Sequence, residues 1–348
     1  MSRIPSSLNP RRTDFQCVVA AFLAQPGLPF ASVLSAERIE RIFARHGNLF
    51  GIGQIYSTAV MVWAFVCQVL QDGKSASCQA AVARVAAHQQ QIGGPVPTAD
   101  TGDYCRARAK LSEAALHDLS VEIADELEDG ADAAWLWKGL HAKLIDGFTF
   151  TMPDTARNQA VYPSPKTQKK GVGLPIARAT IVLSLATAAA LELAAGPYSG
   201  KQTGETALLR DLLDSFHEGD LAVMDRYYCS FMMIALLLSR GVQVCARMHH
   251  KRRVDFRRGR RLGQYDHIIV WTRPARPQWM DEDTYATIPE TLELREIRFN
   301  IEEPGFRTRT ITIATTLTNA DVCSKADIAE LYPERGKVRY SGSRRKRC

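Results

Sequence analysis

Two aspartates stand at the ends of short apolar runs, where a carboxylate can take part in chemistry. Asp146 follows "AKLI" and Asp225 follows "LAVM", and both runs have the composition of buried strands. An ionised carboxylate at the mouth of a buried strand is costly unless it is paired or bound to a cation. If the two strands are neighbours in one sheet, we expect the two carboxylates to hold Mg²⁺ together.

Each aspartate also has a structural alternative. Asp146 and Gly147 stand between "KLI" and "FTF", a pattern typical of a type I′ hairpin turn, in which Asp tolerates a positive φ. Asp225 could instead lie at a strand-to-helix junction and cap the helix that follows. The residues by themselves leave these alternatives open.

A basic segment is the second candidate for function. The chain carries a net charge of +7, but residues 333–348 hold seven Lys or Arg against one acid, so the residues before them net only +1. Inside that nearly neutral part, "KRRVDFRRGRR" predicts contacts with DNA phosphates, which Lys and Arg neutralise. A solvated loop is the alternative. The seven basic residues are Lys251, Arg252, Arg253, Arg257, Arg258, Arg260 and Arg261.

The apolar pattern predicts an α/β protein with a helical first part. Between residues 35 and 140 the spacing is helical, and "YSTAVMVWAFVCQVL" is apolar on nearly every face, as in a core helix. The strands and helices after Trp137 predict a mixed sheet with antiparallel members first and parallel crossovers later. The segments "DHIIVWT", "LELREIRFNIEE" and "FRTRTITIATTL" predict a β-rich stretch, with a turn at "EEPGF". Ser324 and Asp327 predict the start of a last helix.

No membrane span or secretion signal is expected. The most apolar stretch, residues 179–191, covers thirteen residues, too few to span a bilayer, and no apolar run follows the first arginines. The eight cysteines form no C-x-x-C pair, which argues against a disulfide framework or a zinc site. We therefore expect a cytoplasmic protein.

Several segments together resemble the DDE transposases of bacterial insertion sequences, specifically the IS-four group. They are "LIDGFTFTMPDTARNQ", "GPYSGKQTGETALLRDLLD", "GDLAVMDRYYCSFMMIALLLSRG", "HHKRRVDFRRGRRLGQYDH" and "KADIAELY". The resemblance implies an RNase H-like core in which Asp146 and Asp225 are catalytic and bind Mg²⁺, with Mn²⁺ as a substitute. It also implies double-stranded DNA, at the element ends and the target, as the partner, and a homodimer on that DNA. Association with the bacterial nucleoid is then expected.

The resemblance divides the chain into five parts. They are a helical DNA-binding region (1–137), an RNase H-like catalytic core (138–248), a β-rich insertion with the basic segment (249–320), the start of the final catalytic helix (321–335) and an aberrant basic tail (336–348).

The third carboxylate of such transposases is missing from its place. The family signature is Tyr, two residues, Arg, three residues, Glu, six residues and Lys, and Tyr332 and Arg335 match its first two places, with DNA contact as their implied role. Arg339 stands at the place of the glutamate, and a cation there repels Mg²⁺. On a helix, Glu330 and Glu334 lie about 180° and about 140° around from position 339, so neither replaces it.

We interpret the basic end of the sequence as the result of a shift of reading frame near Tyr332. Pro333 and Gly336 interrupt the expected helix, and "SGSRRKRC" has no apolar face. Two functions are then expected. One is a DNA transposase with two-metal phosphodiester hydrolysis and strand transfer at element ends, impaired by loss of the catalytic Glu. The alternative is a non-catalytic, DNA-binding transposase remnant.

Overall fold

A computed structural model of the chain describes residues 31–165, 173–200, 203–249, 251–300 and 310–332. The chain forms two compact units, Met1–Ile123 and Ala124–Cys348, and the boundary between them falls within helix α6 (Glu113–Asp129). Within the described ranges, no helix combines the length and apolar character that a membrane crossing needs.

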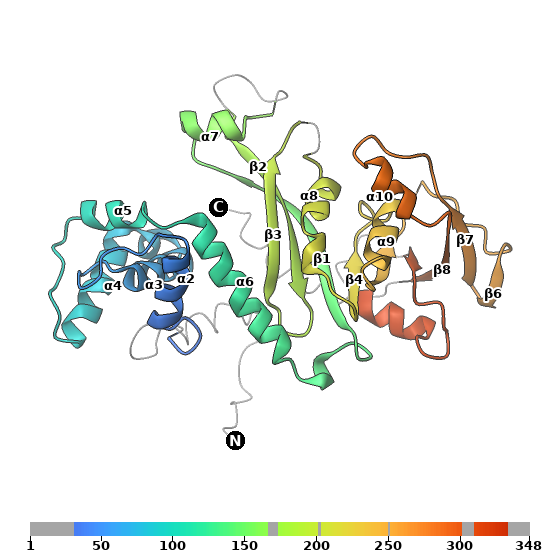
Figure 1. The fold of residues 1–348 in the computed structure, drawn as a ribbon, viewed down its shortest axis with the longest axis horizontal. Coiled ribbons are helices and arrows are strands. Elements are labelled where there is room, and N and C mark those ends of the chain that lie inside the picture. Colours follow the sequence, from blue (N-terminus) through green and yellow to red (C-terminus); the bar gives the residue numbers. More distant parts are fainter. Residues whose placement is uncertain (1–30, 166–172, 201–202, 250, 301–309, 333–348) are drawn as a thin grey trace. The chain divides into compact units, whose positions relative to one another are not determined.

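The first unit is helical. Before α6, its described elements are α2 (Ala36–Arg45), α3 (Thr58–Val69), the 3₁₀ turn η1 (Gly73–Ala76), α4 (Cys78–Gln91) and α5 (Gly102–Arg108) (Figure 1). Nine of the twelve residues of α3 are buried, which confirms the predicted core helix. The sequence pattern does not predict α5, because its seven residues give too little periodicity to recognise.

The described residues of the second unit contain one sheet of nine strands, in the order β3-β2-β1-β4-β5-β9-β8-β7-β6. The strands are β1 (His141–Thr151), β2 (Ile176–Ser184), β3 (Ala190–Pro197), β4 (Asp220–Met224), β5 (Gln243–Arg247), β6 (Arg260–Gly263), β7 (Asp266–Thr272), β8 (Thr291–Asn300) and β9 (Thr310–Thr315). The short helical elements between them are η2 (Ala133–Trp135), α7 (Ala156–Val161), α8 (Glu205–Asp211), η3 (Leu213–Ser215), α9 (Phe231–Leu238) and α10 (Glu282–Thr287).

The first five strands form the RNase H-like part of the sheet. β1, β2 and β3 are antiparallel neighbours, whereas β4 is parallel to β1 and β5 is parallel to β4. Helix α8 precedes β4, and α9 connects β4 with β5. The predicted α/β class is confirmed, with antiparallel strands first and parallel crossovers later.

Strands β6 to β9 continue the same sheet instead of forming a separate one. β9 pairs antiparallel with β5, with Cys245 opposite Thr315, and β8, β7 and β6 follow in turn. One hydrogen-bonded sheet therefore connects the strands of the two aspartates with the basic segment at its edge. The predicted turn "EEPGF" lies outside the described residues.

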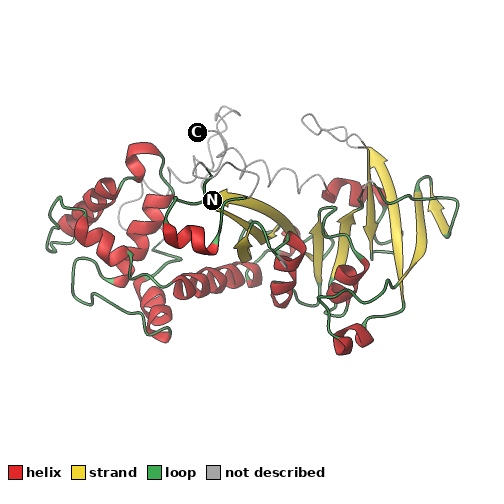
Figure 2. Ribbon diagram, turned by 90° about the horizontal axis from the view of Figure 1, so that it is seen from above, coloured by secondary structure: helices red, strands yellow, loops and turns green. Residues whose placement is uncertain are grey.

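Apolar clusters cover both faces of this sheet. On one face, Ile145 and Met224 pack with the buried side chains of α8 and α9. On the other face, Ala142 and Val223 pack with apolar side chains of the helical residues 325–332. Figure 2 shows helices beside the yellow strands of the sheet. Apolar side chains therefore cover both faces of the sheet beside β1 and β4.

The helical residues 325–332 begin at Ser324, as predicted. The backbone N–H of Asp327 donates to Ser324 Oγ (3.2 Å), and the N–H of Ser324 donates to Asp327 Oδ2 (2.7 Å). This reciprocal pair satisfies donors that the first turn of a helix leaves without an intrahelical partner. Hydrogen bonds from Lys138 and Ser324 lower the pKa of Asp327, so its carboxylate stays ionised at this helix start.

Candidate active site

Asp146 lies in the middle of a strand and not in a turn. β1 continues through Gly147 to Thr151, and Asp146 pairs with Ile181 of β2 while Gly147 pairs with Thr180. The hairpin alternative for Asp146 and Gly147 is therefore wrong. The Asp-Gly pattern misleads because eleven residues run as one strand, which β2 and β4 flank.

Asp225 directly follows β4 and does not cap the next helix. Its Oδ1 accepts a hydrogen bond from the backbone N–H of Arg226 (2.7 Å). Helix α9 begins only at Phe231, and its cap is Ser230, whose Oγ accepts from the N–H of Met233 (3.3 Å). The capping alternative for Asp225 is wrong, because a better cap residue stands next to the helix.

The parallel register of β1 and β4 predicts that Asp146 and Asp225 stand side by side, at the same height along their two strands. The pairing of β1 with β4 ends with Leu144 opposite Val223. Continued by two residues, the same register sets Asp146 opposite Asp225. Neighbouring strands lie about 4.8 Å apart, a distance from which two carboxylates can reach one cation.

Both aspartates belong to the same face of the sheet. Because side chains alternate along a strand, Asp146 shares the face of Ala142 and Asp225 shares that of Val223. Ala142 and Val223 lie in one buried cluster, which also contains Ile328 of the last described helix. Asp146 and Asp225 are themselves half-buried. The carboxylates therefore lie where the apolar cover of this face ends.

Arg247 of β5 is predicted to place a positively charged guanidinium at the same height along the strands as Asp225. The pairing of β4 with β5 ends with Met224 opposite Ala246, and its continuation by one residue sets Asp225 opposite Arg247. Cys245 belongs to the buried cluster of this face, so Arg247, two residues further along β5, lies on it too. Sequence reasoning missed this residue, although "VQVCAR" carries the same signal as "LAVMD", an apolar strand that ends in a charge.

Glu205 approaches the strand beside Asp146 on the opposite face. A Cβ atom placed on Gly147 would lie 2.2 Å from Glu205 Cδ, so a larger residue there would require the Glu205 side chain to shift. Glu205 is in the first turn of α8, and its carbonyl oxygen accepts a hydrogen bond from Thr180 of β2 (3.2 Å). The role of Gly147 is thus close approach, not a turn, and sequence reasoning did not find it.

The last described helix covers the face that carries the aspartates. Its residues Ile328, Leu331 and Tyr332 belong to the cluster of that face, and Tyr332 is only 4% exposed. In the described part of the chain, Tyr332 is thus a packing residue. Arg335 and Arg339, the next two positions of the expected signature, lie outside the described residues.

Two neighbouring carboxylates fit a divalent cation such as Mg²⁺. This ion is usually bound by one or two carboxylates, while water and substrate phosphates complete its coordination. No group of three or more His, Cys, Asp or Glu gathers as a metal site among the residues that the structure describes. Asp146 and Asp225 remain the predicted ligands of such an ion.

The basic arm (residues 251–261) presents its charges to solvent. All seven of its basic side chains are exposed. Arg257 donates Nε–H and Nη2–H to the two oxygens of Asp255 (2.8 and 3.1 Å), and these bonds hold the pKa of Asp255 at about 2. The guanidinium of Arg252 lies 3.4 Å from the centre of the Trp271 ring. Arg260 begins the edge strand β6, so part of the arm is a strand and not a loop.

Buried polar contacts fasten the basic arm to the sheet. The fully buried His267 donates Nδ1–H to the carbonyl oxygen of Arg258 (2.6 Å), and its Nε2 lies 3.0 Å from Glu296 Oε2. Trp271 Nε1–H donates to the other oxygen of Glu296 (2.9 Å). The Phe256 ring lies 4.8 Å from the His267 ring. The backbone of the arm is therefore held in place while its guanidinium groups face outward.

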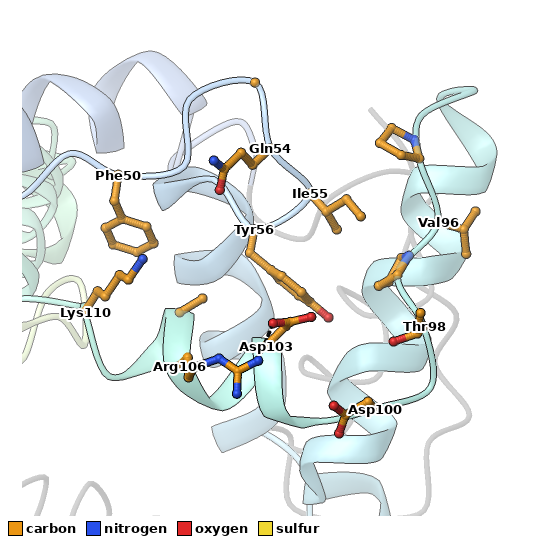
Figure 3. A pocket seen from close by; sticks show the side chains of 14 residues that line it. Phe50, Gln54, Ile55, Tyr56, Val96, Thr98, Asp100, Asp103, Arg106 and Lys110 are labelled. Atoms are coloured by element: carbon orange, nitrogen blue, oxygen red, sulfur yellow. Dashed lines mark hydrogen bonds and ion pairs between the residues drawn. The ribbon is translucent and has the colours of Figure 1, made fainter.

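A separate cavity of about 550 Å³ lies in the first unit (Figure 3). Asp103 and Arg106 of α5 form an ion pair there (2.6 Å), and Lys110 Nζ lies 5.7 Å from the centre of the Phe50 ring. The buried hydroxyl of Tyr56 has no hydrogen-bond partner among the described residues. None of the predicted site residues lines this cavity.

The chain is similar to known transposases. The family model for the transposase DDE domain matches residues 137–338, more than half of the chain. The transposase InsG for insertion sequence element IS4 of Escherichia coli (strain K12) is 23% identical over 259 residues. The match covers 74% of this chain and 57% of that relative, so the chain spans little more than half of the relative's length. By the family match, which includes both aspartates, the chain belongs to the transposases with a DDE domain.

Proposed function

We propose that the chain is a DNA transposase that hydrolyses phosphodiester bonds at the ends of an insertion sequence and transfers the freed strands. The observation that supports this proposal is the parallel register of β1 and β4, which ends with Leu144 opposite Val223 and, continued by two residues, sets Asp146 opposite Asp225. The family match supports it, and the similar protein InsG is a transposase for an insertion sequence.

In this proposal Asp146 and Asp225 would hold Mg²⁺, or Mn²⁺, which would supply positive charge to the scissile phosphate. When bound, such an ion neutralises charge on the phosphate and lowers the pKa of bound water. Arg247, at the level of Asp225, donates hydrogen bonds to a phosphate oxygen that does not react. These residues position the substrate, and none of them forms a covalent bond with it.

The reaction is an in-line displacement at phosphorus. In hydrolysis, a water oxygen forms the new bond, the bond from phosphorus to the 3′ oxygen breaks, and the water proton passes to solvent as the 3′ oxygen takes one up. The free 3′-hydroxyl then attacks a phosphate of the target DNA in the same way. In both steps the attacking oxygen and the leaving oxygen lie in line with the phosphorus, so one pair of carboxylates serves both steps.

The basic arm is proposed to bind the backbone of double-stranded DNA. β4 and β6 are five strand spacings apart in the sheet, or about 24 Å, which is less than one turn of B-DNA at about 34 Å. One duplex can therefore contact the basic arm and reach the aspartates. We assign residues 138–248 as the catalytic core, residues 249–320 as the insertion that carries the basic arm, and residues 1–137 as a further DNA-binding region.

We further propose that catalysis by this chain is impaired. Arg339 stands where the third carboxylate of the family is expected, and its positive charge disfavours a metal ion nearby. The same residue favours a second candidate function, a non-catalytic protein that binds element ends and competes with an intact transposase. A homodimer on DNA is compatible with both.

Cleavage of a duplex that carries the element ends, with Mg²⁺ or Mn²⁺, separates the two functions. We expect the native chain to bind the duplex and to cut it slowly or not at all. A variant whose residues 333–348 are replaced by a helical segment with Glu at position 339 is expected to cut at least about tenfold faster. Adding Asp146→Asn to that variant is the matched control and removes cleavage.

Three outcomes contradict these proposals separately. If the native chain cuts as fast as the repaired one, the impairment is refuted. If the repaired chain binds the duplex but never cuts, only the DNA-binding function remains. If the genomic DNA after the Tyr332 codon encodes no helix with a glutamate in a neighbouring frame, the shift of reading frame is refuted.

A further inference from the structure

One buried carboxylate lies between the two side chains that hold the basic arm. Glu296 of β8 is 4% exposed and stands directly opposite His267 of β7 in the antiparallel register. Its Oε2 lies 3.0 Å from His267 Nε2, and its Oε1 accepts a hydrogen bond from Trp271 Nε1–H (2.9 Å). A buried carboxylate is costly unless its oxygens find partners, and these two contacts supply them. Glu296 therefore fixes the two rings relative to one another.

Each of the two rings holds a different end of the basic arm. Near the start of the arm, the guanidinium of Arg252 lies 3.4 Å from the centre of the Trp271 ring. Near its end, His267 donates Nδ1–H to the carbonyl oxygen of Arg258 (2.6 Å). Because both rings also contact Glu296, this one carboxylate acts on both ends of the arm.

Two further contacts seat the arm on the strands. The Phe256 ring, in the middle of the arm, lies 4.8 Å from the His267 ring and 5.6 Å from the Tyr265 ring. Gly259 has a φ of +75°, and a Cβ atom there would lie 2.1 Å from the carbonyl oxygen of Ile268. Because that oxygen belongs to the backbone of β7, a larger residue at position 259 would displace the arm from this strand. The path of the arm is thus set along its length.

We propose that Glu296 is a positioning residue for DNA binding, an inference that rests on the proposed contact between the basic arm and DNA. It preorganises the arm, so that the guanidinium groups are in place before a duplex arrives. A segment that becomes ordered only on binding loses affinity, because its conformational entropy is lost at that moment. Glu296 is buried and negative, so it acts on phosphate binding through His267 and Trp271.

A positioning residue and a phosphate contact differ in their response to salt. Loss of a contact lowers the slope of log affinity against log salt, because fewer counterions are released on binding. Loss of preorganisation leaves the number of basic side chains unchanged, so the affinity falls while the slope stays the same. A series of salt concentrations therefore separates the two roles.

Fluorescence anisotropy with a labelled duplex, at several salt concentrations, tests the inference on the full chain. Glu296→Leu leaves the two rings without their common partner, and the affinity is expected to fall roughly three- to tenfold at an unchanged slope. Glu293→Leu, at an exposed position of the same strand, is the matched control for the lost negative charge and should not lower the affinity.

Glu296→Gln is the conservative variant and should bind the duplex as the native chain does. Because His267 Nδ1–H goes to a carbonyl oxygen, the contact between Nε2 and Glu296 Oε2 holds a second hydrogen, on the ring or on the carboxyl group. Glutamine supplies this hydrogen from its amide N–H, and its oxygen still accepts from Trp271 Nε1–H. Native affinity in this variant shows that the hydrogen bonds place the arm, whereas the loss seen in Glu296→Leu would overturn that reason.

Gly259→Ala keeps the inference testable if Glu296→Leu does not fold. This variant displaces the arm from β7 but keeps Glu296 and every basic side chain, so we expect the same loss of affinity at an unchanged slope. Circular dichroism and urea unfolding establish that each compared variant is folded. Native affinity in Gly259→Ala, or in a folded Glu296→Leu, overturns the inference.

Hydrogen exchange distinguishes failure of this inference from failure of the proposed function. Without DNA, the amide hydrogens of residues 256–261 are expected to exchange at least about tenfold faster in Glu296→Leu and Gly259→Ala than in the native chain. Unchanged exchange in both variants refutes the positioning role, even while the native chain binds the duplex. A native chain that binds no duplex refutes the proposed DNA binding, and the inference with it.

Discussion

Asp146 of β1 lies opposite Asp225 when the parallel register of β1 and β4 is continued by two residues beyond Leu144 and Val223. The two carboxylates come from positions far apart in the sequence, and the two strands set them on one face of the sheet. Arg247 of β5 follows at the same level. This line of two anions and one cation is the basis of the predictions for the candidate active site.

Replacement of either aspartate is expected to weaken metal binding. Asp146→Asn or Asp225→Asn removes one of the two anionic ligands, and the affinity for Mn²⁺ should fall on the order of tenfold or more. Titration of the full chain with Mn²⁺ by electron paramagnetic resonance measures it. The exposed Asp321→Asn is the matched control and should leave the affinity unchanged. An unchanged affinity in both site variants would exclude the pair as a metal site.

Neutral substitutions in the basic arm should weaken DNA binding in a salt-dependent way. Arg260→Gln combined with Arg261→Gln removes up to two phosphate contacts, so the slope of log affinity against log salt should fall by about 1 to 2. Fluorescence anisotropy with a labelled duplex at several salt concentrations measures it. Arg276→Gln, whose native side chain pairs with Glu282 (3.2 Å), is the control. A slope equal to that of the native chain would mean that the arm contacts no phosphate.

Gly147→Ala should destabilise the second unit. The new Cβ would meet Glu205 Cδ at 2.2 Å, so the flexible Glu205 side chain must shift, and the cost should be at most the about 1–3 kcal/mol typical of overpacking. Urea unfolding followed by circular dichroism measures the change. Gly204→Ala, at a position where a Cβ meets nothing within 4 Å, is the control. The second substitution Glu205→Ala should recover part of the loss in Gly147→Ala, and an absence of recovery would show that the clash is not the cause.

Asp255 should titrate at low pH. Hydrogen bonds from Arg257 lower its pKa in the folded chain from 3.8 to about 2. Because the folded pKa is depressed, any stability from this pair is present above pH 3.8 and is lost as the pH falls toward 2. The carboxyl carbon signal in nuclear magnetic resonance gives the midpoint. Arg257→Gln should return it toward the ordinary value, and an equal midpoint in both proteins would contradict the contact.

The sequence by itself determined the elements and the two acids. Local patterns predict core helix α3, the succession of strands and helices along the chain from β1 to β5, and the capped start at Ser324. They do so because apolar spacing and cap residues act within a few positions of the chain. Asp146 and Asp225 were recognisable as charges that end apolar runs. The local pattern also allowed a hairpin turn at Asp146 and a helix cap at Asp225, because Asp is common in turns, in caps and in metal sites alike.

The tertiary structure decided which of those alternatives holds and what lies beside them. Strand register is a relation between distant segments, so only the folded sheet sets Asp146, Asp225 and Arg247 at one level. The same applies to His267, which meets the basic arm across a hairpin. Side-chain contacts between elements depend on packing that no single stretch of sequence contains.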